Sequence, residues 1–105
     1  MHFPALLQFD GDDELEVISS DIEFTQFLDY VQLNCSLVDS NGAVYKIRKE
    51  SNGQFSAHES TKTMSVEEAV AIAQRHLATL DQCCISKFNA GTVAEVVQAL
   101  ASLDS

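Results

Sequence analysis

The chain has 105 residues, 46% of them hydrophobic and 21% charged, a composition typical of one folded globular domain rather than a disordered segment. It carries 16 acidic and six basic residues, a formal net charge of −10, and its first 45 residues contain no lysine or arginine. Nucleic-acid binding requires basic side chains that displace counterions from phosphates. We therefore expect neither nucleic acid nor an anionic membrane among the partners.

The compartment follows from two further features of the sequence. No apolar stretch is long enough to span a bilayer, and the first residues lack the basic region of a secretory signal. Three cysteines, Cys35, Cys83 and Cys84, are an odd and sparse set that does not indicate a disulfide framework. We expect a reduced, cytoplasmic protein without a membrane segment.

The N-terminal third predicts two strands and a helix. Two largely apolar segments indicate strands at residues 5–9 and 15–18, joined as a hairpin by the acidic turn Asp10-Gly11-Asp12-Asp13. Ser20 and Glu23 fit the S-x-x-E capping box, which predicts a helix over residues 21–32. The apolar positions of this helix are Ile22, Phe24, Phe27, Leu28 and Val31.

The middle of the chain predicts a second hairpin and an edge strand. Strands at residues 36–39 and 43–48 flank Asn41-Gly42, a pair that favours a type I′ turn because both residues tolerate positive φ. A short strand is expected at residues 54–58, at an edge of the sheet.

Two more capping boxes, Ser65 with Glu68 and Thr92 with Glu95, predict the remaining helices. The first covers residues 66–80, with Val66, Val70, Ala73, Leu77 and Leu80 as one apolar stripe. The second follows Gly91, and a short strand at residues 83–88 separates the two helices.

The predicted order is ββαβββαβα. It indicates a single α+β domain over residues 1–105, with a mainly antiparallel sheet of five to six short strands and three helices on one face of it. Residues 54–88 could form one right-handed strand-helix-strand crossover.

Five carboxylates crowd into the segment from residue 10 to residue 16: Asp10, Asp12, Asp13, Glu14 and Glu16. Such a segment can bind a basic protein surface or support self-association. The simpler interpretation is a solvated turn whose charges guard a hairpin edge. Divalent-metal binding at this turn is a further alternative, although the sixth and twelfth positions of an EF-hand loop would fall on Leu15 and Asp21 instead of glycine and glutamate.

The remaining candidate residues are cysteines, histidines and a basic stretch. Cys83 or Cys84 with His58 or His76 could serve a small-ligand binder or a thiol-dependent enzyme, whereas buried cysteines and exposed histidines are the simpler interpretation. Lys46, Arg48 and Lys49 could form an anion site, but we favour pairing with the acidic hairpin beside them.

Three segments together resemble a family of small uncharacterised proteobacterial proteins. They are the two turns Phe9-Asp10-Gly11-Asp12-Asp13-Glu14-Leu15 and Val38-Asp39-Ser40-Asn41-Gly42, followed by Met64-Ser65-Val66-Glu67-Glu68. The resemblance implies a bacterial cytoplasmic α+β domain and carries over no activity and no catalytic residue.

No nucleotide-binding or hydrolase motif is present in the sequence. We therefore expect a small acidic protein-interaction module that has no cofactor and does not act as an enzyme.

Overall fold

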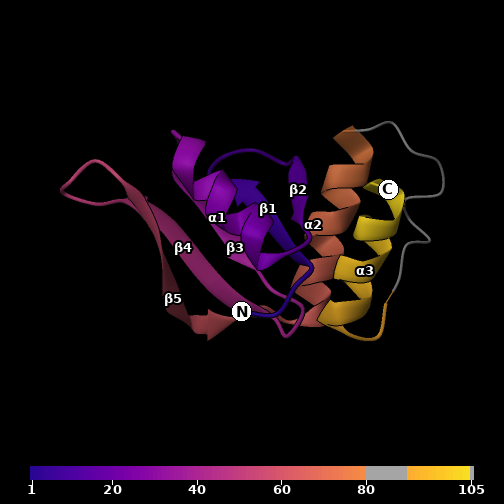
Figure 1. Ribbon diagram of the computed structural model, residues 1–105. Helices are drawn as coiled ribbons and strands as arrows, with labels where there is room; N and C mark the ends of the chain where they lie inside the picture. Colours follow the sequence, from indigo (N-terminus) through magenta and orange to yellow (C-terminus); the bar gives the residue numbers. More distant parts are fainter. Residues whose placement is uncertain (80–89, 105) are drawn as a thin grey trace.

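A computed structural model of the protein describes residues 1–79 and 90–104, and these residues form the predicted single α+β domain (Figure 1). One sheet contains the strands β1 (Ala5–Phe9), β2 (Leu15–Ile18), β3 (Cys35–Val38), β4 (Ala43–Lys49) and β5 (Phe55–Thr63). Their order across the sheet is β2-β1-β3-β4-β5, and all neighbours are antiparallel, as predicted. The helices are α1 (Asp21–Tyr30), α2 (Val66–Thr79) and α3 (Val93–Asp104). The strand predicted at residues 83–88, with the second half of the predicted crossover, lies outside the described residues.

The helices lie on both faces of the sheet, so the expectation that they share one face is wrong. Leu7 of β1 packs with α1, whereas the adjacent Leu6 packs with α2 and α3. Successive side chains of a strand point to opposite faces, and Ala5, Leu6 and Leu7 are all buried. A strand that is apolar on both sides must be covered on both sides, which requires two cores. Figure 1 shows α1 over one face of the sheet and α2 beside α3.

All three predicted N-terminal caps form. The hydroxyls of Ser20, Ser65 and Thr92 each accept the backbone N–H three residues later, at 3.2 Å. The return contact differs between the helices. Glu68 reaches the N–H of the cap residue Ser65 itself, while Glu23 and Glu95 reach one residue further back, to Ser19 and Gly91. Only α2 therefore has the reciprocal capping box that the sequence predicts for all three.

The β3–β4 turn is shifted by one residue from the prediction. The carbonyl of Asp39 accepts the N–H of Gly42 at 3.0 Å, so Ser40 and Asn41 are the central residues of the turn. Gly42 follows them with φ +84°. The predicted type I′ turn, with Asn41 and Gly42 at its centre, is therefore wrong, and Gly42 adopts its left-handed conformation just after the two central residues.

The edge strand β5 is longer than predicted. It runs to Thr63 and pairs with the whole of β4, from Lys49 opposite Phe55 to Ala43 opposite Thr63. An irregularity between Ala43 and Tyr45 accommodates the extra length. The β4–β5 hairpin projects from the rest of the domain (Figure 1). The domain as a whole measures 45 × 26 × 24 Å.

Candidate functional site: the acidic hairpin and an aromatic patch

We call residues 10–16 the acidic hairpin, because they form the β1–β2 turn and the start of β2. Among the described residues, two of its five carboxylates have cationic partners. Asp10 Oδ2 lies 3.4 Å from Arg48 Nη2 on β4, and Asp13 Oδ1 lies 3.6 Å from Arg75 Nε on α2. The predicted pairing of the basic stretch with this hairpin is thus found at Arg48. All four side chains are more than a third exposed, so each pair contributes only about 0–1 kcal/mol to stability.

The tip of the acidic hairpin is shaped by Asp12. Its Oδ1 accepts the N–H of Glu14 at 3.1 Å, and its carbonyl accepts the side-chain amide of Gln8 at 2.7 Å. An aspartate that binds a backbone N–H two residues on is a common turn-forming device. In the part of the chain that the structure describes, no three His, Cys, Asp or Glu side chains converge on a possible metal position. The metal-binding alternative therefore gains no geometric support.

Glu16 lies beside a group of apolar side chains that are exposed or half-buried. We call this group the aromatic patch: Phe9 of β1, Tyr30 at the end of α1, and Leu33 after it. Tyr30 is 68% exposed and Leu33 is 64% exposed. Together with Glu16, Phe27 and the chain between Tyr30 and Leu33, they line a hollow of about 430 Å³.

Two rings of the aromatic patch, those of Phe9 and Tyr30, pack against the buried ring of Phe27. Phe27 is 2% exposed in the core, and its ring contacts Tyr30 edge to face at a centroid distance of 5.7 Å. The ring centroids of Phe9 and Phe27 lie 6.3 Å apart. These distances fall within the range of favourable aromatic pairs. The core therefore holds Tyr30 in place while leaving its ring largely exposed to solvent.

The aromatic patch was not identified from the sequence, although one sequence feature points to it. Tyr30 and Leu33 are large side chains that do not belong to the apolar positions predicted to be buried by α1, and both are exposed in the structure. Ile22, which was assigned to the buried side, is 72% exposed. Phe24 and Phe27 alone of the predicted set are buried in the core.

The alternative thiol site is not tested by the structure, because its cysteines are not among the described residues. Cys83 and Cys84 lie outside those residues. His76 is 9% exposed, contrary to the simpler interpretation, and is held by the backbone of β2. Cys35 is fully buried in the core beside α1, and burial, together with the nearby Asp10 charge, raises the pKa of its thiol to about 11. A thiol with such a pKa is a poor nucleophile near neutral pH.

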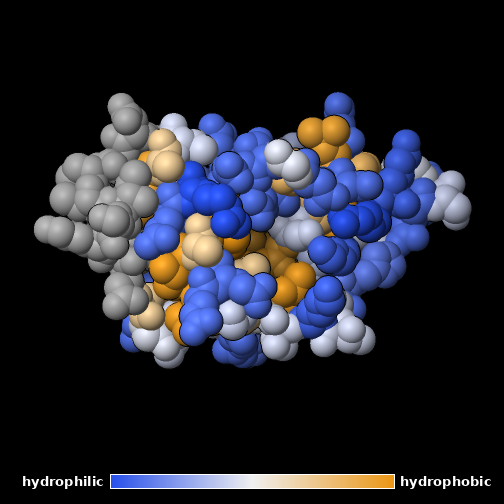
Figure 2. Space-filling view, turned by 180° about the vertical axis from the view of Figure 1, so that it is seen from behind, coloured by the Kyte–Doolittle hydropathy of each residue, from blue (hydrophilic) through white to orange (hydrophobic). Residues whose placement is uncertain are grey.

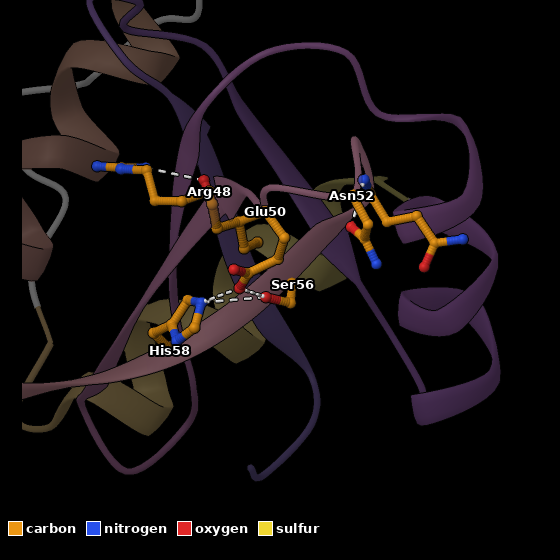
Figure 3. A network of polar contacts seen from close by, with 7 residues as sticks. Arg48, Glu50, Asn52, Ser56 and His58 are labelled. Carbon is orange, nitrogen blue, oxygen red and sulfur yellow. Dashed lines mark hydrogen bonds and ion pairs between the residues drawn. The ribbon is translucent and has the colours of Figure 1, made fainter.

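His58 belongs to a polar cluster on the β4–β5 hairpin that includes serine and glutamate (Figure 3). The Nε2 atom of His58 contacts both Glu50 Oε1 and, at 3.0 Å, Ser56 Oγ. The Ser56 hydroxyl also donates to the same Glu50 oxygen. In a hydrolytic triad the serine and the carboxylate bind opposite nitrogens of the imidazole. Here they bind the same nitrogen, so the cluster has no proton relay and stabilises the hairpin instead.

Comparison with known proteins agrees with this fold. A family model named DUF4144, described as a protein structure with unknown function, matches residues 3–100. The chain belongs to the DUF4144 family. It is similar to the NMR structure of a protein from Shewanella amazonensis, with 25% sequence identity, a TM-score of 0.69, and coverage of 100% of this chain and 91% of that one. No functionally curated protein matches this DUF4144 chain.

The family assignment confirms the predicted resemblance to an uncharacterised bacterial family of α+β proteins. In the described residues of this family member, no helix combines the length and apolarity that crossing a bilayer requires.

Proposed function

We propose that this DUF4144 chain is a small cytoplasmic protein-interaction module, and that it docks a basic partner through the aromatic patch and the acidic hairpin. The observation that carries the proposal is the pairing of two largely exposed apolar side chains, Tyr30 and Leu33, with Glu16 at the rim of the same hollow. Exposed apolar groups rimmed by charge are typical of protein-binding surfaces.

The partner chemistry follows from the charge. Glu16 has no cationic neighbour within ion-pair distance among the described residues, whereas Asp10 and Asp13 are paired within the chain. A partner that places an apolar side chain in the hollow and a lysine or arginine beside Glu16 would complement both features. The net charge of −10 would also accelerate its approach and disfavour polyanions.

A binding role is favoured over catalysis by the state of the candidate catalytic groups. The Cys35 thiol is buried, the His58 imidazole is committed to Glu50 and Ser56, and the His76 Nδ1 accepts a backbone N–H. A thiol-dependent site at Cys83 or Cys84 is the second candidate function, and rapid alkylation of either cysteine near neutral pH would favour it.

The proposal is tested by titrating the ¹⁵N-labelled protein with a peptide of alternating lysine and leucine, and with matched peptides that carry glutamate or serine in place of lysine. The lysine peptide should shift the amide signals of Phe9, Glu16, Tyr30 and Leu33 and leave those of the exposed face of α2 unchanged. Equal responses to the glutamate peptide, or shifts elsewhere only, would contradict the proposal. Sedimentation of the free protein would reveal self-association.

A further inference from the structure

A second open surface lies on the opposite face of the sheet, between α2 and the β4–β5 hairpin. Strand register aligns Gln8, Ser36, Lys46 and His58, one residue from each of four neighbouring strands, in a polar row across this face. The adjacent row contains Leu6, Val38 and Val44, which are apolar. On this face the surface therefore changes from apolar to polar between residues that are two positions apart along each strand.

The boundary between these rows is hollowed into a groove, which we call the lysine groove. It has a volume of about 600 Å³, and its apolar floor includes Val44 and Met64. Figure 2 shows this side of the molecule, where apolar side chains are visible in the middle of a hydrophilic surface. The floor continues beneath α2 as a recess of about 30 Å³ lined by apolar side chains such as Leu15 and Ile72.

Two cations line the lysine groove from neighbouring strands, Lys46 of β4 and Lys62 of β5. Within the described residues neither lysine has a carboxylate at ion-pair distance, and Lys46 Nζ contacts only the neutral Ser36 hydroxyl, at 3.3 Å. Arg48 and Arg75, in contrast, are paired with the acidic hairpin. Although the sequence has 16 acidic and only six basic residues, two lysines at one apolar groove thus have no acidic partner in the part of the chain that the structure describes.

One carboxylate also lines the lysine groove, that of Glu68. Its Oε1 is committed to the N-terminal cap of α2, where it lies 3.4 Å from the N–H and 3.2 Å from the hydroxyl of Ser65. The positive end of the helix dipole offsets part of its charge. The groove as a whole therefore presents a positive rim over an apolar floor.

We propose that the lysine groove binds a small amphipathic carboxylate, with its apolar chain on Val44 and Met64 and its anionic head between Lys46 and Lys62. Hydrophobic contact provides affinity along the floor, and the lysines select an anion over a neutral or cationic head group. This site is separate from the aromatic patch and does not depend on the function proposed for it.

The test uses octanoate as the probe, with octanol, octylammonium and acetate as matched compounds that lack the charge, reverse it or lack the chain. Octanoate should shift the amide signals of Ser36, Val44, Lys46 and Met64 in the ¹⁵N-labelled protein. Lys46→Gln and Lys62→Gln should each weaken binding about tenfold. Lys49→Gln removes a charge from the same strand on its other face and should leave the affinity unchanged.

Three results would overturn the proposal. They are equal binding of octanol or octylammonium, an octanoate response that survives the double variant Lys46→Gln/Lys62→Gln, and binding of phosphatidylglycerol vesicles without any response to octanoate. The last result would indicate a membrane surface as the ligand instead. All the substituted lysines are exposed, so the variants should fold normally, and their amide spectra would show this directly.

Discussion

The imidazole of His76 on α2 accepts the backbone N–H of Leu15 on β2, with Nδ1 3.0 Å from the nitrogen. Both residues are buried, and 61 positions of sequence separate them. The bond joins the acidic hairpin to α2, whose buried side chains pack with Leu15 in the same core. Because Nδ1 accepts, the ring proton must lie on Nε2.

His76→Ala should lower the free energy of unfolding by about 1–3 kcal/mol, since it leaves the Leu15 N–H buried without an acceptor. Arg75→Gln is the matched control, because it removes the neighbouring contact of α2 with Asp13, which is an exposed ion pair. Its effect should stay below about 1 kcal/mol. Urea denaturation measures both, and ¹⁵N shifts of the His76 ring report the tautomer. A larger loss for Arg75→Gln than for His76→Ala would contradict this assignment.

Gly42→Ala should destabilise the protein more than Gly11→Ala. The two glycines have nearly equal φ values, +84° and +83°, in the left-handed region that disfavours an alanine at both positions. A Cβ at Gly42 would lie 2.9 Å from the carbonyl oxygen of Met64, whereas a Cβ at Gly11 would meet nothing within 4 Å. The difference between the two free energies of unfolding therefore isolates the contact between the β3–β4 turn and the β5–α2 connection. Equal losses would show that this close approach is not maintained in solution.

Cys35 should resist alkylation in the folded protein. Its pKa of about 11 leaves roughly a thousandth of the thiol as thiolate at pH 8, and burial blocks access to it. Iodoacetamide labelling followed by peptide mass spectrometry distinguishes Cys35 from Cys83 and Cys84. Labelling of Cys35 should become rapid only in denaturant, where its pKa returns to the ordinary value. Native-state labelling at the rate of a free thiol would contradict its burial.

Glu50 should titrate below the ordinary range of a glutamate. Hydrogen bonds from Ser56 and His58 lower the pKa of its carboxyl group, so they favour the carboxylate. The stability that these hydrogen bonds contribute is fully present above the pKa that Glu50 has in the unfolded chain. It is lost as the pH falls through the lower pKa that Glu50 has in the folded protein. Ser56→Ala should therefore raise the Glu50 pKa, as followed by the NMR shift of its carboxyl carbon. An unchanged pKa in that variant would show that the cluster does not form in solution.

Local signals in the sequence predicted most elements to within one or two residues, because hairpins and caps depend on neighbours in the chain. Ser20, Ser65 and Thr92 all cap helices, and the hairpin around residues 10–14 has the predicted strands. The placement of the helices on two faces was missed, although the run Ala5-Leu6-Leu7 makes β1 apolar on both sides and so indicates that both faces of the sheet are covered.

The role of the Asp39 carboxylate could not be predicted from the sequence. The sequence places it among the carboxylates of the anionic N-terminal third, yet it is 1% exposed. Its carboxylate accepts the backbone N–H groups of His2, Asn41 and Ala43 at 2.9–3.0 Å. Its contacts with the turn are local, but the contact with His2 spans 37 positions and could not be read from spacing. Asp39 therefore organises the fold and contributes nothing to the docking surface.

The affinity of the alternating lysine–leucine peptide for Tyr30→Ser and Ile22→Ser tests the central claim most directly. Both residues are exposed apolar side chains of α1, at 68% and 72%, but only Tyr30 belongs to the aromatic patch. Tyr30→Ser should weaken binding about tenfold or more, because exposed tyrosines at interfaces are frequent binding hot spots. Ile22→Ser should bind as the unmodified chain does. Equal affinities of the two variants, or a greater loss for Ile22→Ser, would contradict a docking role for the aromatic patch.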